Sequence, residues 1–135
     1  MRLDEATSWE RLRSSDHGVL GTVHARRGVD LVPVVFVVDG ARVVIPVDTV
    51  KAKAGRRLQR LVNLDADARC TLLVDHHDRD WSRLWWVRAH GQAQEHPPDP
   101  TLVSALADAF PPYRAAGTVT SLIVLDVDEV TGWTA

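Results

Sequence analysis

Cysteine is almost absent from this chain of 135 residues, which contains only Cys70. A single cysteine cannot form an intramolecular disulfide, so we expect a reducing, cytoplasmic location. The residues that follow it, 71–74, are typical of a buried strand, which favours an inert core thiol over a nucleophile. The segment 1–9 carries acidic residues and has no apolar centre, so we expect no signal peptide.

Long apolar runs and familiar site motifs are also missing. The longest apolar run, 31–38, is too short to cross a membrane, so no membrane partner is expected. The chain lacks the GxGxxG, P-loop and GxSxG patterns, which leaves classical dinucleotide, nucleotide and hydrolase sites without support. No HxH, HExxH or CxxC spacing accompanies the adjacent His76 and His77, so no metal site is expected.

Positive charge is concentrated in one segment. No acidic residue lies between Asp48 and Asp65, and the cations there are Lys51, Lys53, Arg56, Arg57 and Arg60. The remaining eleven cations of the chain are outnumbered by 18 acidic residues. A local positive segment on an acidic protein suits a small anion such as a phosphate better than a nucleic acid, which we do not expect as a partner. The same spacing also fits a solvated helix face.

The hydrophobic pattern predicts more strands than helices. We expect strands over 19–24, 31–38, 41–47, 68–74, 84–93 and 122–127, and helices over 4–13, 55–63 and from Pro100 to just before Pro111. Turns are expected at Gly28 and at Asp39-Gly40, and Pro33 favours an edge strand. Successive hairpins without βαβ alternation predict one mainly β domain over residues 1–135, with an antiparallel barrel.

Aromatic residues are few, but three of the five tryptophans fall within residues 81–86. On a strand, Trp86, Arg88 and His90 share one face and Trp85 lies on the other. Such a face can stack on a planar ring or form a core or a subunit interface, and the spacing alone leaves these readings open.

Several of these segments resemble one known family. The segments are Gly18-Val-Leu-Gly-Thr-Val, the strand from Leu31, Lys51 to Asn63, Leu73-Val-Asp-His-His-Asp, Asp80-Trp-Ser-Arg-Leu-Trp-Trp-Val-Arg and Thr131-Gly-Trp. Together they are similar to the pyridoxamine 5′-phosphate oxidase-like superfamily over nearly the whole chain. More narrowly, they resemble its actinobacterial flavin/deazaflavin oxidoreductases of the B type, which are probable F420-dependent enzymes.

The resemblance implies a split β-barrel that forms a homodimer with two cofactor sites at the subunit interface. It assigns the phosphate or polyglutamate tail of the cofactor to Lys51, Lys53, Arg56 and Arg57, and with less support to Arg60 and Asn63. It places the cofactor ring near the edges of two strands and near a third strand that contains tryptophan. The residues concerned are Val32, Pro33 and Val34 on the first strand, Pro46, Val47, Asp48 and Thr49 at the second, and Trp85, Trp86 and Arg88 on the third.

The resemblance also implies a function. Reduced F420 would deliver a hydride to a small electron-poor organic substrate, with FMN as the alternative cofactor. The chain ends Thr131-Gly-Trp-Thr-Ala without the arginine-rich substrate contacts of the oxidases proper, which weakens vitamin B6 oxidation. A protein that binds flavin, F420 or haem without turnover is a further alternative. No catalytic residue is identified; the candidates for proton delivery are His24, His76, His77 and Asp80.

Overall fold

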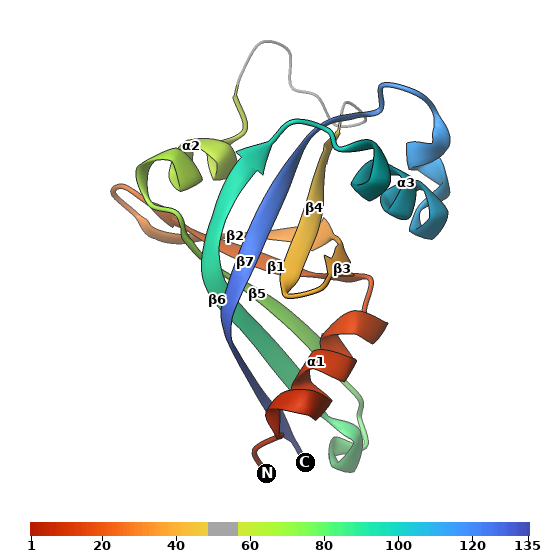
Figure 1. Ribbon diagram of the computed structural model, residues 1–135. Coiled ribbons are helices and arrows are strands. Elements are labelled where there is room, and N and C mark those ends of the chain that lie inside the picture. Colours follow the sequence, from red (N-terminus) through yellow and green to blue (C-terminus); the bar gives the residue numbers. More distant parts are fainter. Residues whose placement is uncertain (49–56) are drawn as a thin grey trace.

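A computed structural model describes residues 1–48 and 57–135. The helices are α1 (Glu5–Ser14), α2 (Gln59–Ala66) and α3 (Pro100–Ala109), with short 3₁₀ helices η1 (Trp81–Arg83) and η2 (Pro111–Arg114). The strands are β1 (His17–His24), β2 (Gly28–Val35), β3 (Val37–Asp39), β4 (Arg42–Asp48), β5 (Arg69–His76), β6 (Trp85–His96) and β7 (Val119–Thr134). Figure 1 shows α1 beside the lower part of the sheet and α2 and α3 near its upper end.

The strands form one antiparallel sheet in the order β2-β1-β5-β6-β7-β4-β3. Its two edge strands are joined by a single residue, because β2 ends at Val35 and β3 begins at Val37. The sheet therefore curves until its opposite edges meet at Phe36. This residue is 1% exposed, and its backbone N–H donates to the carbonyl of Asp16. The single strand predicted over 31–38 is thus wrong, since Phe36 turns inward between two strands.

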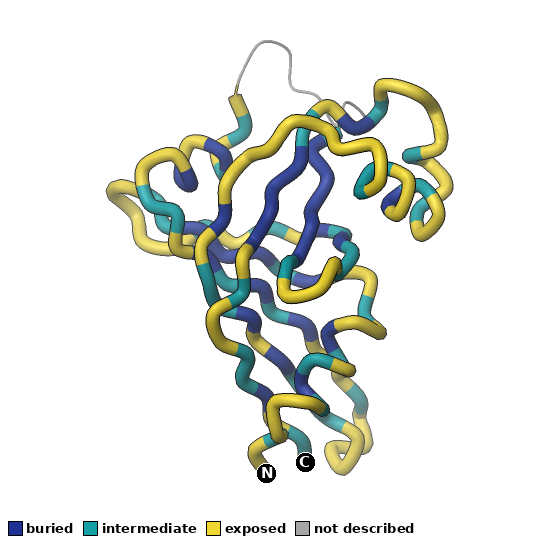
Figure 2. The backbone as a smooth tube through the Cα atoms, in the orientation of Figure 1, coloured by how far each residue is buried: buried dark blue, intermediate teal, exposed yellow. Residues whose placement is uncertain are grey.

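Side chains on both faces of β4 are buried, and so are those of the part of β7 that pairs with β4, as Figure 2 shows in dark blue. Val43 and Ile45 point into the main core, together with Leu125 and Ile123 opposite them on β7. The residues between them, such as Val44, face the other way and pack with Leu106 of α3 in a second cluster. Because side chains alternate along a strand, α3 has to cover the face that the main core leaves open.

Turns and helix caps follow the local sequence closely. Gly28 and Gly40 adopt φ angles of 94° and 60°, which their lack of a side chain permits in tight hairpin turns. Asp99 accepts hydrogen bonds from two first-turn amides of α3, and Pro100 occupies the first turn as predicted. Pro33 lies on the edge strand β2, where one missing ladder donor is tolerated.

Two predicted elements have an end that is wrong by four or more residues. The helix predicted over 55–63 is α2, which begins only at Gln59 and continues to Ala66. Leu58 is its N-cap residue and packs against the main core, so the side chain that suggested a helical face belongs to the approach to the helix. The strand predicted over 122–127 is β7, which begins at Val119 and extends to Thr134, because β6 pairs with it from Leu122 to Thr134 despite its polar residues. Within the described residues, no helix is long and apolar enough to span a bilayer.

Candidate functional site

Four of the predicted cofactor residues, Thr49, Lys51, Lys53 and Arg56, lie outside the described residues. The strand that leads to them, β4, is described up to Asp48. The predicted ring contacts Pro46 and Val47 on this strand are buried, with side chains on opposite faces of the sheet. Asp48, the last residue of β4, is partly exposed, unlike Pro46 and Val47. The described part of the candidate site therefore begins at Asp48.

Arg60 lies in the first turn of α2, close to the end of β4. Its side chain is half-buried, and its Nε has no hydrogen-bond partner among residues 1–48 and 57–135. Burial lowers the pKa of the guanidinium, while the charge of Asp48 acts in the opposite direction. A buried N–H group without an acceptor is costly, and an anion that accepts its hydrogen bond would remove that cost. Arg60 is therefore the described cation best prepared to bind an anionic group.

Asp48 is held by Tyr113 of η2, whose hydroxyl donates a hydrogen bond to Oδ2 at 2.7 Å. Burial and this bond to the carboxylate raise the pKa of Tyr113, so the phenol stays protonated as the donor. The contact joins the α3–η2 region to the end of β4, beside Arg60. Sequence analysis missed Tyr113 because it lies far along the chain and in no recognisable motif.

Arg57 differs from Arg60, because its guanidinium is already paired with two carboxylates. Its Nε and Nη2 donate to the two oxygens of Asp65 at 3.0 and 3.2 Å, and its Nη1 donates to Glu95 Oε1 at 3.0 Å. Glu95 in turn accepts a 2.6 Å hydrogen bond from Ser121 on β7 through its other oxygen. The group formed by Arg57, Asp65, Glu95 and Ser121, which we name the Arg57 clamp, links α2 to the ends of β6 and β7.

Asn63, another predicted cofactor residue, is 2% exposed and fully engaged inside the protein. Its Nδ2 donates to Thr22 and to Asp30 at 2.9 Å each, and its Oδ1 accepts from Gln59 at 2.9 Å. These bonds fasten α2 to β1 and β2. A buried amide whose groups are all satisfied stabilises the position of the helix, and here it leaves no donor directed at a ligand.

A second candidate surface lies on the sheet face opposite the main core, away from α3. The strand registers place its residues on the same side of β2, β1, β5 and β6. We call this surface the outer face; it includes Val29, Leu31, Pro33, Val19, Val23, Thr71, Leu73, Asp75, Trp86, Arg88 and His90. Val29 and Leu31 are 62% and 70% exposed, which is unusual for apolar side chains that lie side by side on an edge strand.

The predicted ring contacts divide between the two sides of the sheet. Pro33, Trp86 and Arg88 lie on the outer face, whereas Val32 and Val34 point into the main core. The guanidinium carbon of Arg88 lies 4.2 Å from the ring centroid of Trp86, a cation–π contact. Trp85 lies on the other side of β6, where Arg11 covers it at 4.8 Å. The outer face thus gathers three of the ring contacts that the sequence suggested.

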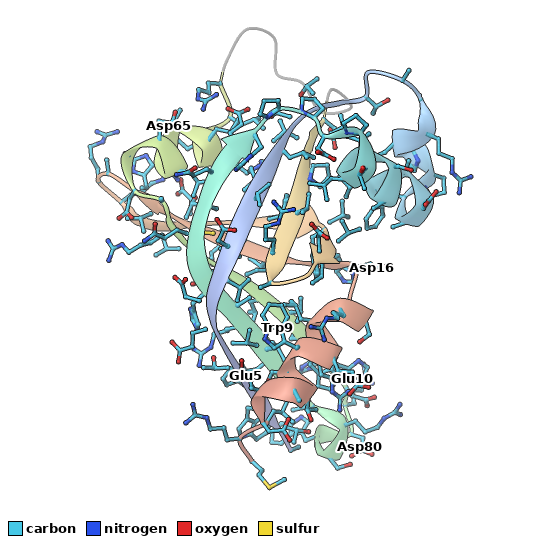
Figure 3. All side chains as sticks on the ribbon, viewed as in Figure 1. Glu5, Trp9, Glu10, Asp16, Asp65 and Asp80 are labelled. Atoms are coloured by element: carbon cyan, nitrogen blue, oxygen red, sulfur yellow. The ribbon has the colours of Figure 1, made fainter. Side chains whose placement is uncertain are left out.

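The candidates for proton delivery are not gathered at Arg60. His24 accepts hydrogen bonds from the backbone N–H groups of Arg26 and Arg27 in the β1–β2 turn. His76 stacks on Trp85, and Asp80 caps η1. Figure 3 shows Asp80 at the opposite end of the molecule from Asp65 on α2. His90 does lie on the outer face, where its Nδ1 is 3.0 Å from the hydroxyl of Thr71; sequence analysis placed it on that face without assigning it a role.

Other features of the chain lie away from the candidate site. Two surface hollows of about 340 and 490 Å³ lie between α1 and β7 and between α3 and the sheet, and neither contains a predicted cofactor residue. Cys70 is 5% exposed and lies in the core, as predicted, and burial raises the pKa of its thiol to about 12, which disfavours the thiolate. Within the described residues, no group of histidine, cysteine or acidic side chains could hold a metal ion.

Solved structures with this fold include two named as FAD-binding. The FAD-binding protein from Mesorhizobium loti is 15% identical, with a TM-score of 0.72, and the match covers 98% of this chain and 95% of that one. The FAD-binding protein from Mycobacterium smegmatis is 20% identical, with a TM-score of 0.64 and coverage of 98% and 96%. A conserved hypothetical protein from Mycobacterium tuberculosis is 17% identical, with a TM-score of 0.76 and coverage of 98% and 85%. At these identities the similarity shows the fold alone.

No curated protein matches the sequence significantly. A family model does match, and its description is pyridoxamine 5′-phosphate oxidase. The match covers residues 4–134, which is nearly the whole chain and includes every element of the sheet. The chain therefore belongs to the pyridoxamine 5′-phosphate oxidase family.

Proposed function

We propose that this protein is an oxidoreductase that uses coenzyme F420 to reduce a small electron-poor organic substrate. Membership of the oxidase family supports a flavin-type cofactor. The choice of F420 rests on the finer resemblance of residues 80–88 and of the cationic segment. FMN is the alternative, and the two neighbours named as FAD-binding add FAD to the cofactors that have to be tested.

The observation that carries the proposal is the buried Nε of Arg60, which lacks a hydrogen-bond partner in the described residues. The guanidinium is half-buried and lies at the point where β4 leads into the segment with the other cations. Each of the three cofactors has an anionic phosphate group that fits this donor. Arg60 would bind that group, while the bound ring would supply the redox chemistry. The side chains of this protein would then orient the ring and exclude water.

We further propose that the protein is a homodimer with split β-barrel subunits. The one-residue connection between the edge strands β2 and β3 supports such a barrel. A second copy of the chain would cover the outer face, from the exposed apolar residues of β2 to Trp86 and Arg88 on β6. A flavin-type ring can then lie between the copies, which agrees with the absence of predicted cofactor residues from the two hollows described above.

The test is a titration of the purified protein with F420, FMN and FAD, followed by the quenching of tryptophan fluorescence. We expect F420 to bind with a dissociation constant of about 1 μM or below. Both flavins should bind more weakly. A preference for FMN or FAD would assign the protein to the flavin-dependent members of the family. Failure to bind any of the three would remove the proposed function.

A non-catalytic carrier is the second candidate function. It is favoured by the positions of His24, His76 and Asp80, which do not converge on Arg60. An enzyme of this kind does not need an acid or base, because the cofactor does most of the chemistry. Turnover of reduced F420 with a panel of conjugated carbonyls and unsaturated rings separates the two. Tight binding without oxidation of the cofactor by any acceptor would support the carrier.

A further inference from the structure

Arg57 and Arg60 lie three positions apart, and the described contacts give them different chemistry. The guanidinium of Arg57 uses three N–H groups on Asp65 and Glu95, whereas the Nε of Arg60 has no partner in the described residues. An anion that approached Arg57 would meet two carboxylates around one cation. It would have to displace one of them and overcome repulsion from both. The surroundings of Arg57 therefore disfavour a cofactor phosphate.

The same contacts fit a mechanical role. Arg57 precedes α2, and its side chain reaches Asp65 in the last turn of that helix. It also reaches Glu95 on β6, which is bonded to Ser121 on β7. Isolated surface ion pairs contribute little to stability, but a planar guanidinium that binds one carboxylate with two donors and a second with a third is a network with defined geometry. These contacts hold α2 on the ends of β6 and β7.

We infer that Arg57 is a positioning residue for cofactor binding and not a ligand of the cofactor. The Arg57 clamp fixes α2, and α2 carries Arg60 to its place beside Asp48 and Tyr113. Two carboxylates, Asp65 and Glu95, would thereby favour the binding of an anion although their own charge repels it. This inference rests on the proposed function, because it assumes that the cofactor's anionic group binds at Arg60.

The two roles of Arg57 predict opposite effects of removing the carboxylates. If Arg57 were a ligand, the Asp65→Asn/Glu95→Gln double variant would free its guanidinium and remove repulsion, so the cofactor would bind more tightly. If Arg57 positions α2, the same variant would weaken binding by about three- to tenfold. Arg57→Ala should then act in the same direction. The Glu10→Gln/Asp108→Asn variant, which neutralises two exposed carboxylates on α1 and α3, is the charge-matched control.

The experiment combines two measurements on the full-length chain. The affinity for F420 and FMN is measured by tryptophan fluorescence, and amide hydrogen exchange is measured over residues 59–66 without cofactor. We expect the double variant to bind more weakly than the control and to exchange faster in α2, with the rest of the sheet unchanged. Tighter binding, or unchanged affinity and exchange, would overturn the inference. If the wild-type protein binds neither probe, the proposed function fails, and the exchange measurement still decides whether the clamp holds α2.

Discussion

At the scale of single residues, burial and pairing divide cations that look equivalent. The Nε of Arg60 is removed from solvent without an acceptor in the described chain, and such an arrangement costs folding free energy. A group of this kind persists when it serves another purpose, and here the purpose we propose is to bind an anion. Arg60 should therefore matter more for binding than for folding.

Replacing Arg60 with alanine tests this point. We expect the affinity for the cofactor to fall by roughly 1.5–3 kcal/mol, the usual contribution of hydrogen bonds to charged groups. The melting temperature should stay the same or rise, since an unpaired buried group is removed. The dissociation constant from fluorescence and the melting curve from circular dichroism are the two measurements.

The matched control for this variant is Arg79→Ala. Arg79 is exposed in the loop before η1, and its removal changes the net charge by the same amount. Figure 1 shows that loop at the opposite end of the molecule from α2. Equal losses of affinity in both variants would mean that only overall charge attracts the cofactor, and Arg60 would lose its assigned role.

At the scale of secondary-structure elements, the β6–β7 pair forms the centre of the sheet and contains a bulge. The register shifts between His90 and Gly91, where one extra residue of β7, Asp128, is accommodated. A side chain at Gly91 would place its Cβ 1.9 Å from the carbonyl oxygen of Asp126, far inside contact distance. Glycine is required here because two backbones approach closely, not because of a special φ angle.

We expect Gly91→Ala to destabilise the protein by about 1 to 3 kcal/mol, the range for overpacking a filled interior. The strands would have to separate locally, because the clash is with backbone that has no alternative rotamer. Urea unfolding gives the free-energy difference. Gln94→Ala, an exposed change on the same strand, should leave stability nearly unchanged. A wild-type midpoint for Gly91→Ala would contradict the close approach.

The sequence predicts the mainly β fold because local signals are strong at the hairpin turns, at the Asp99 cap and along the apolar strands. It does not predict the polar half of β7. These residues form a strand because they pair with β6, and not because of their own strand propensity. Nor could the sequence separate Arg57 from Arg60, because Glu95 and Tyr113 are brought to them only by the tertiary fold. The cationic segment is visible in the sequence, and the pairing of its members is not.

At the scale of the whole molecule, the outer face is the main feature without a partner in the described chain. Leu31 and Val29 expose most of their surface on the edge strand β2, and the half-buried Trp86 lies on the same face three strands away, on β6. Contiguous exposed apolar surface of this kind on an edge strand promotes association. A symmetric pair of subunits would bury the same patch twice, as two-fold interfaces do.

The variant Leu31→Asp should therefore dissociate the proposed dimer. We expect the dimer dissociation constant to rise by about tenfold or more, because a carboxylate would have to be desolvated in an apolar contact. Sedimentation velocity over a range of concentrations measures this constant. Val62→Asp is the control, since Val62 is also apolar and exposed (43%) but lies on α2. A wild-type protein that is monomeric at all concentrations would remove the proposed interface.

The single-residue connection at Phe36 also restricts how the gene can change in length. Adding or deleting one residue there would rotate every side chain of β2 or β3 to the other face of its strand. The connection has no slack to absorb the change, since Phe36 is buried and its backbone is bonded to Asp16. Insertions and deletions in descendants of this sequence should accordingly accumulate in exposed connections such as 115–117, while the spacing between the two edge strands stays constant.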